Sequence, residues 1–447
     1  MMMHSDQLTV FRYIEEHLSF YMEKLREIVQ SSNIYTHPLD VATNVFEATL
    51  LAHQHKLDFH TKTTGQDAGF LYASQHNAAT HSLLLYHACP LAKLAPSGSE
   101  DSFHLSPRAR AIAPIVACLA ALDAYQQTLG TLPINILWLI DCTNEDNPSR
   151  LDEMLQQHIE PGQIDGCLWS KGCITADGIP ILALGTKGLL KVALEVCTAH
   201  ASVHSMHGAI APNALWRLTW ALNSLKNVHE EILIEGFYDT LLSAQDDEIE
   251  LLSRLPDLSS VLAQKWGVER LLWGLQGFQL NYAHLLTPTC TIHSIRSETM
   301  PADVDTTIPV QARAYLDFYL VPDQDPLDIF QKLQRHLIVN DFADISVHLL
   351  YASKPAHSII NAPFVQAVYS AATAAYGNEP WVLPYASEGR TIAAFQHILN
   401  LPTVLTGISY PEENGYTINE QDYRRDFSGS IKHLAMLFEE VGHTKRS

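Results

Sequence analysis

Residues 204–213 read His204-Ser205-Met206-His207-Gly208-Ala209-Ile210-Ala211-Pro212-Asn213. Its small residues, followed by a proline, indicate a turn, and residues 213–225 behind it are predicted to form a helix. Before the stretch, residues 189–197 alternate between apolar and polar side chains, which is typical of a half-exposed antiparallel strand. The quoted residues therefore join a strand to a helix.

The chain beyond this stretch continues the antiparallel pattern. Two more alternating segments, 312–321 and 345–351, are separated by a predicted helix at 326–337. The resulting order is β-α-β-β-α-β, which gives an antiparallel sheet with helices on one face. Residues 186–355 are therefore expected to form an α+β domain of the ferredoxin-like kind.

Outside residues 186–355 the strands are apolar throughout. Residues 82–86 and 133–140 are examples, and each strand leads into polar residues. Strands that alternate with helices at these lengths indicate a mostly parallel sheet covered on both faces. The same texture returns after residue 355, so residues 1–185 and 356–447 are expected to form one discontinuous α/β domain. A separate amphipathic helix is predicted at 7–31.

The charge of the chain excludes some classes of partner. The 28 basic and 49 acidic residues give a net charge of −21 over 447 residues, and there is no basic patch. Nucleic acids and anionic membranes are therefore not expected partners. The seven cysteines form no CxxC pair, which disfavours a disulfide scaffold or a zinc knuckle. With no signal-peptide pattern and no apolar run near the ~20 residues of a membrane span, a cytoplasmic location is expected.

The order of elements, together with several strings, resembles the di-zinc metallopeptidases. That family includes carnosinase (cytosolic non-specific dipeptidase), acetylornithine deacetylase, succinyl-diaminopimelate desuccinylase and glutamate carboxypeptidase. Besides residues 204–213, the resemblance rests on 306–322 and 388–392, and on parallels to the carnosinase-like subgroup at 120–126 and 150–155. It implies a zinc-exopeptidase-like α/β catalytic-type domain that carries an inserted lid.

The resemblance also implies a homodimer. In this family the lid usually pairs two chains through a sheet edge and a helix. The alternating strand at 189–197 is compatible with that role here.

The resemblance implies two zinc ions held by five side chains, and most of these are replaced. His87 matches the first ligand and Glu145 matches a ligand of the other metal, so one ligand would remain for each ion. A catalytic zinc ordinarily has three protein ligands. Asn144 stands where the family has the glutamate that activates water. The other replaced positions are Cys89, Arg110, Ser170 and Tyr416.

Arg110 takes the place of the aspartate that bridges both metals. A guanidinium is effectively always charged, and a unit cation about 4 Å from a dication is repelled by roughly 8 kcal/mol at an effective dielectric constant of about 20. We expect Arg110 to fill the volume of the metals and to pair with Glu145. The chain is accordingly expected to hold no cofactor, although the family would use two zinc ions.

Two other interpretations of these residues remain open. In one, the site is rebuilt for amide-bond chemistry, with Cys89 as a nucleophile activated by the His87 imidazole, beside Glu145. His204, which in the family reaches the active site and steadies the oxyanion, would then act from the lid. In the other, Cys89 is simply a buried cysteine. Cys89 and Cys142 follow neighbouring strands, so a disulfide or a transition-metal site between them is a further hypothesis.

The sequence therefore predicts a degenerate, dipeptidase-like scaffold that binds a peptide-like or amino-acid-like ligand. Glu388 and Arg390 lie on the turn that, by resemblance, holds the carboxylate of the substrate. Arg390 stands where glycine is usual and could itself grip an acidic group. The histidines 53, 55 and 60 have near-ligand spacing, but the segment is charged and a solvated face is favoured. An ordinary active dipeptidase would require the local alignments to be wrong in three places.

Overall fold

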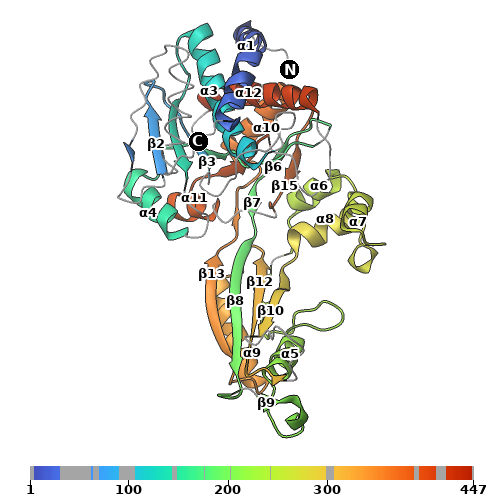
Figure 1. Ribbon diagram of the computed structural model, residues 1–447. Helices are drawn as coiled ribbons and strands as arrows, with labels where there is room; N and C mark the ends of the chain where they lie inside the picture. Colours follow the sequence, from blue (N-terminus) through green and yellow to red (C-terminus); the bar gives the residue numbers. More distant parts are fainter. Residues whose placement is uncertain are drawn as a thin grey trace.

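The computed structural model describes the chain in eleven segments. These are residues 5–30, 62–63, 70–89, 106–142, 148–175, 177–201, 203–241, 243–297, 307–386, 392–408 and 419–444. They form a broad α/β body and an elongated second body that extends from it (Figure 1). The mixed helix and sheet architecture confirms the expected α/β class.

The α/β body is built on an eight-stranded sheet with the order β1-β2-β4-β3-β5-β16-β6-β15. Its central strands pair in parallel, with β3 between β4 and β5, whereas β2 joins β4 antiparallel. The strands are β1 (Lys62–Thr63), β2 (Phe70–Gln75), β3 (Ser82–Ala88), β4 (Asn135–Asp141), β5 (Gly166–Trp169), β6 (Ile181–Ala183), β15 (Trp381–Leu383) and β16 (Thr403–Leu405).

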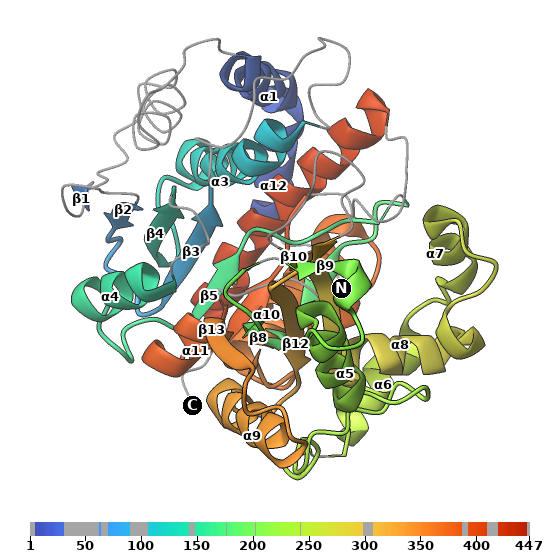
Figure 2. The ribbon, with the colours of Figure 1, turned by 60° about the horizontal axis from the view of Figure 1, so that its bottom comes forward.

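Helices cover both faces of this sheet, as the apolar strands require. One face packs under α1 (Ser5–Gln30), α3 (Pro107–Leu129), α10 (Pro363–Tyr376) and α12 (Glu420–His443). The other packs against α4 (Pro148–His158) and α11 (Ile392–Leu399). Figure 2 shows α1, α3 and α12 grouped on one side and α4 and α11 on the other. The strand alternation assigns side chains to these faces, with Leu83 and Leu85 on the α3 side and Leu84 and Tyr86 on the α4 side.

Helix α3 lies in the middle of the α3-side core. Ser106 caps it by accepting a hydrogen bond from the Ala109 amide, and Gly130 ends it in a left-handed conformation. Among the described residues it is the one helix long and apolar enough to cross a membrane, but 78% of that window is buried inside the protein. Such burial is typical of the core helix of a globular domain.

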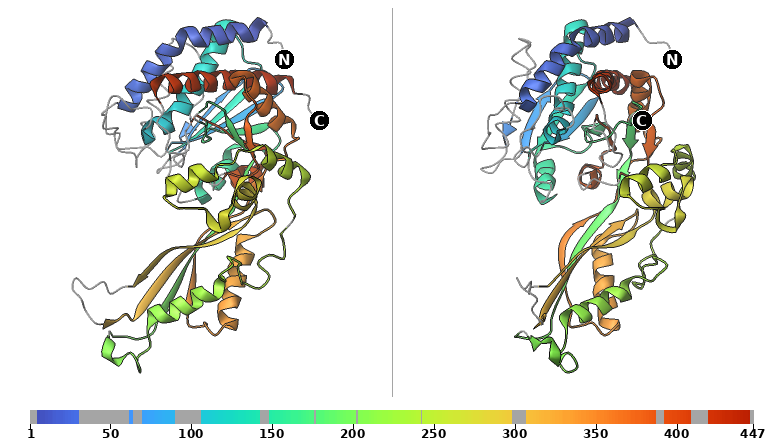
Figure 3. Two further views of the ribbon diagram at one scale, coloured as in Figure 1. Left: turned by 90° about the vertical axis from the view of Figure 1, so that its right-hand side faces the viewer. Right: turned by 45° about the vertical axis from the view of Figure 1, so that its right-hand side comes forward.

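The second body contains a four-stranded antiparallel sheet with the order β10-β12-β8-β13. Its strands are β8 (Gly188–Cys197), β10 (Thr289–Ser297), β12 (Gln311–Leu320) and β13 (Ser346–Ser353). Two helices, α5 (Ala214–Leu225) and α9 (Pro326–Val339), cover the same face (Figure 3). The strand predicted at 189–197 lies inside the sheet, so the edges are β10 and β13. The expectation that this strand serves as a pairing edge is therefore wrong.

Short strands connect the two bodies. β7 (Gly185–Thr186) pairs with β14 (Ala356–His357) where the chain leaves and re-enters the α/β body. At the far end of the elongated body, β9 (Val203–His204) pairs with β11 (Thr307–Ile308) and leads into the short helix η3 (Ser205–His207). We propose residues 186–355 as the inserted domain and call it the lid.

The acidic segment 226–275 also has a place in the fold. Much of it forms α6 (Asp246–Arg254), α7 (Ser259–Trp266) and η4 (Leu272–Gly274), followed by α8 (Gly277–Leu286), beside the junction of the two bodies. The Tyr385 hydroxyl donates to the Glu248 carboxylate over 2.9 Å, which ties α6 to the α/β body. The Lys187 ammonium donates to the carbonyls of His284 and Thr287 at the C-terminal end of α8.

Candidate functional site

The candidate site lies where β3 and β4 end beside the first turn of α3. His87 is the sixth residue of β3, and Cys89 follows the strand directly. Because side chains alternate along a strand, His87 and Cys89 share a face with Leu83 and Leu85, under the helices of the α3 side. The sequence thus brings His87, Cys89 and the start of α3 together, as the resemblance implies.

His87 is a core histidine in this structure. Its side chain is 1% exposed, and Nδ1 accepts a hydrogen bond of 2.8 Å from the indole Nε1 of Trp138. Burial lowers the pKa of His87 to about 3, so the ring is neutral. Nε2, which carries the proton in that tautomer, lies near the Pro114 backbone and makes no hydrogen bond within the described residues. The lone pair on Nδ1 is therefore already used by Trp138.

Cys89 is completely buried and its thiol is protonated. The Cys89 amide donates to the Asp141 carbonyl over 2.6 Å, which extends the β3–β4 ladder by one residue. Burial raises the pKa of the thiol well above its ordinary value, nearby Cys142 and Asp141 raise it further, and Arg108 opposes them. A nucleophilic cysteine needs a lowered pKa and a base. Here the thiol is held neutral and Nδ1 of His87 is bonded to Trp138, so the structure does not provide the Cys89–His87 pair that the rebuilt-site hypothesis requires.

The cation that lowers the pKa of the Cys89 thiol belongs to Arg108. Its side chain is 6% exposed, and Nη1 donates to the Val29 carbonyl in α1 over 3.3 Å. Arg110, two residues along the same helix and half-buried, starts on a different side, because successive helical residues are about 100° apart. Arg108 is not among the residues predicted from the sequence. The cap of α3 at Ser106 is the signal that could have placed it in the first turn.

Asp141 is held on the opposite face of the sheet. The Tyr86 hydroxyl donates to Oδ2 of Asp141 over 2.8 Å, and both residues are buried. The carboxylate is thus directed away from the face that carries His87. Ser170, at the position of another replaced ligand, follows β5, is half-buried and donates its amide to the Tyr86 carbonyl over 3.1 Å.

His204 lies in the lid rather than beside His87. It is exposed, and its Nδ1 accepts a hydrogen bond of 3.2 Å from the Met206 amide, which caps η3. β9 is at the end of the lid farthest from the α/β body (Figures 1 and 3). A single chain therefore does not bring His204 to the residues at the end of β3.

The remaining predicted residues fall outside the part of the chain that the structure describes. These are Asn144, Glu145, Glu388, Arg390 and Tyr416, together with the histidines 53, 55 and 60. The expected pairing of Arg110 with Glu145 therefore stays a prediction.

The donor set at the end of β3 does not suit the two zinc ions of the family. Nδ1 of His87 already accepts a hydrogen bond from Trp138. Cys89 stands where the family has a carboxylate, and the Arg108 cation acts on the Cys89 thiol. Within the described segments, no group of three or more histidine, cysteine, aspartate or glutamate side chains could hold a metal ion. The described residues at this strand end are packed in the core, and Nδ1 of His87 is hydrogen-bonded to Trp138 rather than open to a metal ion.

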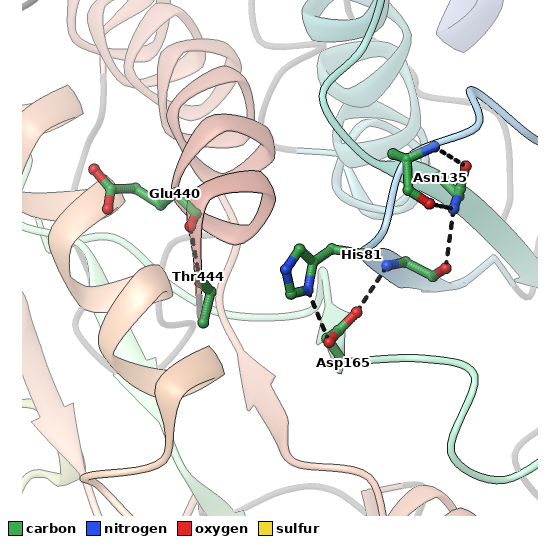
Figure 4. Close-up of polar contacts among 7 residues, drawn as sticks. His81, Asn135, Asp165, Glu440 and Thr444 are labelled. Carbon is green, nitrogen blue, oxygen red and sulfur yellow. Dashed lines mark hydrogen bonds and ion pairs between the residues drawn. The ribbon is translucent and has the colours of Figure 1, made fainter. Parts of the chain in front are cut away.

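The opposite end of the same strands carries a polar cluster that the sequence analysis did not identify. His81 Nδ1 lies 3.0 Å from Oδ1 of Asp165, and the Ser82 amide donates to Oδ2 over 2.8 Å (Figure 4). Asn135 joins the cluster through a hydrogen bond of 3.3 Å to the Ser82 hydroxyl. These contacts fix the N-terminal ends of β3, β4 and β5 and are structural.

Comparisons with known proteins agree with this architecture. Residues 184–341 match the peptidase dimerisation domain of the M20 family. The chain is 23% identical over 337 residues to the Beta-Ala-His dipeptidase of Homo sapiens, covering 73% of this chain and 66% of that protein. It is 21% identical over 338 residues to the Cys-Gly metallodipeptidase DUG1 of Saccharomyces cerevisiae, covering 72% and 68%. The matches thus span about two thirds of the length of these relatives.

Solved structures show the same fold. An M20 family metallo-carboxypeptidase from Sulfolobus solfataricus superposes with a TM-score of 0.77 at 22% identity, covering 95% of this chain and 99% of that one. Human carnosine dipeptidase 1 gives 0.75 at 19% identity, covering 98% and 99%. At these identities the superpositions establish the fold alone.

Proposed function

We propose that this chain, a dipeptidase-like relative of the M20 metallopeptidases, keeps the scaffold of that family but does not carry out its two-zinc hydrolysis. Its role is then to bind a small peptide-like or amino-acid-like ligand between the scaffold and the lid. The sequence similarity to the Beta-Ala-His and Cys-Gly dipeptidases supports this class of ligand.

One observation carries the proposal. At the end of β3 a neutral His87 hydrogen-bonded to Trp138 stands next to a buried, protonated Cys89, with the Arg108 guanidinium close enough to affect the pKa of that thiol. Zinc ligands must be deprotonated and must offer free lone pairs. A permanent cation at this position opposes divalent metal binding further.

The assembly proposed with it is a homodimer through the lid. The match to a dimerisation domain supports this, as do Trp216 and Trp220 on α5, which are more than half exposed and whose rings stack 6.0 Å apart. The edge strand β10 adds the exposed Ile292 and Ile295. Exposed apolar groups of this kind mark interaction surfaces. A cytoplasmic location is part of the same proposal.

The direct test is a hydrolysis assay with Cys-Gly and β-Ala-His as substrates, with and without added Zn²⁺ or Mn²⁺. The human Beta-Ala-His dipeptidase serves as the positive control. We expect no release of amino acids above the buffer blank. Hydrolysis that a chelator abolishes would contradict the proposal.

The variant Cys89→Ala separates this proposal from the rebuilt-site alternative. If the chain shows a metal-independent turnover and Cys89→Ala removes it, the Cys/His/Glu hypothesis is favoured instead. Ligand binding is measured separately as the rise in unfolding temperature with added dipeptides, since a ligand that binds only the folded state stabilises it.

A further inference from the structure

Cys89 and Cys142 occupy facing positions on neighbouring strands. The parallel register of β3 and β4 pairs His87 with Ile140 and Ala88 with Asp141. The hydrogen bond from the Cys89 amide to the Asp141 carbonyl continues this ladder. In a parallel ladder that bond places Cys89 opposite the residue after Asp141, which is Cys142.

The two thiols also lie on the same face of the sheet. Both cysteines belong to the core under α3, together with Leu85, Trp138 and Ile140. Neighbouring strands are about 4.8 Å apart, and disulfides form between Cα atoms roughly 4.4–6.8 Å apart. The electrostatic influence of Cys142 on Cys89 agrees with this proximity.

From this geometry we propose that Cys89 and Cys142 form a dithiol site that a small peroxide oxidises to a disulfide. Both thiols are protonated while they are buried, so the first step takes place during a local opening that admits water and peroxide. One cysteine then loses its proton to water and its thiolate attacks hydrogen peroxide, which yields a sulfenic acid and hydroxide. The hydroxide and the released proton form one water. The second thiol then displaces the hydroxyl of the sulfenic acid, which forms the S–S bond and releases a second water. Two thiols and one peroxide thus give one disulfide and two waters.

The site is specific to this pair. The structure contains no disulfide among the seven cysteines, and the other five are Cys118, Cys167, Cys173, Cys197 and Cys290. Cys118 and Cys167 are equally buried, but Cys118 lies on α3, outside the sheet, and Cys167 on β5 is in register with Leu84 and Thr403. Burial excludes bulky oxidants and proteins, so the expected reactant is a small neutral molecule that enters through local opening.

A disulfide there would tie the C-terminal ends of β3 and β4 together beside the first turn of α3. In this position the cross-link would restrict movement of the end of the sheet that carries His87. The inference rests on register and burial alone, so it stands whether or not the proposed function is correct.

The experiment is oxidation of the full chain with hydrogen peroxide, followed by unfolding, alkylation of the remaining thiols and peptide mapping without reduction. Cys197→Ser is introduced first because Cys197 is exposed. We expect one peptide pair that joins Cys89 to Cys142, 2 Da lighter than the sum of its parts, with Cys118 and Cys167 fully alkylated.

Two variants and one condition make the result decisive. Cys118→Ser is expected to keep the cross-link, and Cys142→Ser to abolish it while Cys89 is recovered alkylated or singly oxidised. The mapping of the chain that retains both cysteines stands by itself if Cys142→Ser does not fold. Recovery of Cys89 and Cys142 as separate alkylated residues after the half-buried Cys173 has been oxidised would overturn the proposal. Formation of the cross-link only in urea would do the same.

Discussion

The indole N–H of Trp138 donates a 2.8 Å hydrogen bond to Nδ1 of His87, with both side chains fully buried. This bond occupies the nitrogen of the one histidine that the sequence aligns with a metal ligand at a strand end. Burial lowers the pKa of His87 to about 3, and in the neutral ring Nδ1 is able to accept from the indole. Because of this hydrogen bond, His87 is a packed core residue, although its position matches a metal ligand by sequence.

Replacing Trp138 tests this bond, and Trp169 provides a matched control. Trp169 is equally buried, but its Nε1 has no hydrogen-bond partner within the described residues. Both Trp→Phe changes remove similar volume, whereas only Trp138→Phe leaves a buried acceptor unpaired. We expect Trp138→Phe to lower the free energy of unfolding by about 1–3 kcal/mol more than Trp169→Phe. Equal losses in urea titrations would show that the bond contributes nothing.

The free energy of unfolding is expected to decrease at acid pH because two buried histidines are neutral in the folded chain. Burial lowers the pKa of His87 to about 3 and that of His433 to about 4, below the ordinary value of about 6.5. The unfolded chain therefore binds more protons than the folded one below about pH 6.5, and the contribution of each ring is lost as the pH falls toward the folded value.

Substitution isolates these two groups from the carboxylates. Between pH 6 and pH 5 each histidine should account for a loss of about 1 kcal/mol in the free energy of unfolding. The variants His87→Gln and His433→Gln should each flatten the pH profile by that amount. Profiles that stay parallel to that of the parent chain would argue against neutral buried rings.

The lid surface predicts the oligomeric state. We expect light scattering to give the mass of a dimer for the parent chain and of a monomer for Trp216→Glu with Trp220→Glu, because a charge on this face opposes apolar association. Leu8→Glu introduces the same charge at a half-exposed site on α1 and should remain dimeric. A parent chain that is monomeric at all concentrations would disprove the proposed dimer.

Lys187 is predicted to hold the helical segment at the junction. Its ammonium donates to the His284 carbonyl over 2.8 Å and to the Thr287 carbonyl over 2.6 Å. A charged donor stabilises by about 1.5–3 kcal/mol per bond. Lys187→Met should therefore speed hydrogen exchange and proteolysis in α8. Lys354→Met, which removes only an exposed ion pair with Asp325, should not. Unchanged exchange in α8 would contradict this role.

Much of the fold could be predicted because local pattern and global topology agree. The apolar strand at 82–86 and the alternating strand at 312–321 each carry the burial pattern of their sheet in the sequence itself. The place of residues 189–197 inside the lid sheet could not be read in the same way. Alternation shows which face is buried, but whether a strand is an edge depends on partners far along the chain.

The candidate site was harder to predict than the fold. Counting residues placed a cation at the start of α3, but Arg108 and Arg110 start about 200° apart around the helix, and only the cap at Ser106 fixes the register. The hydrogen-bond partner of His87 could not be predicted from the sequence for a related reason. Trp138 is 51 residues away on the next strand, and only the pairing of β3 with β4 brings the two rings together.

The proposed function depends on the absence of a two-zinc centre from this scaffold. The most direct measurement is the metal content of the purified chain after incubation with excess Zn²⁺ and desalting, determined by elemental analysis with the human Beta-Ala-His dipeptidase treated in parallel. We predict well under one zinc per chain, while the human enzyme retains its metal. One or two zinc ions per chain, retained through desalting, would contradict the account.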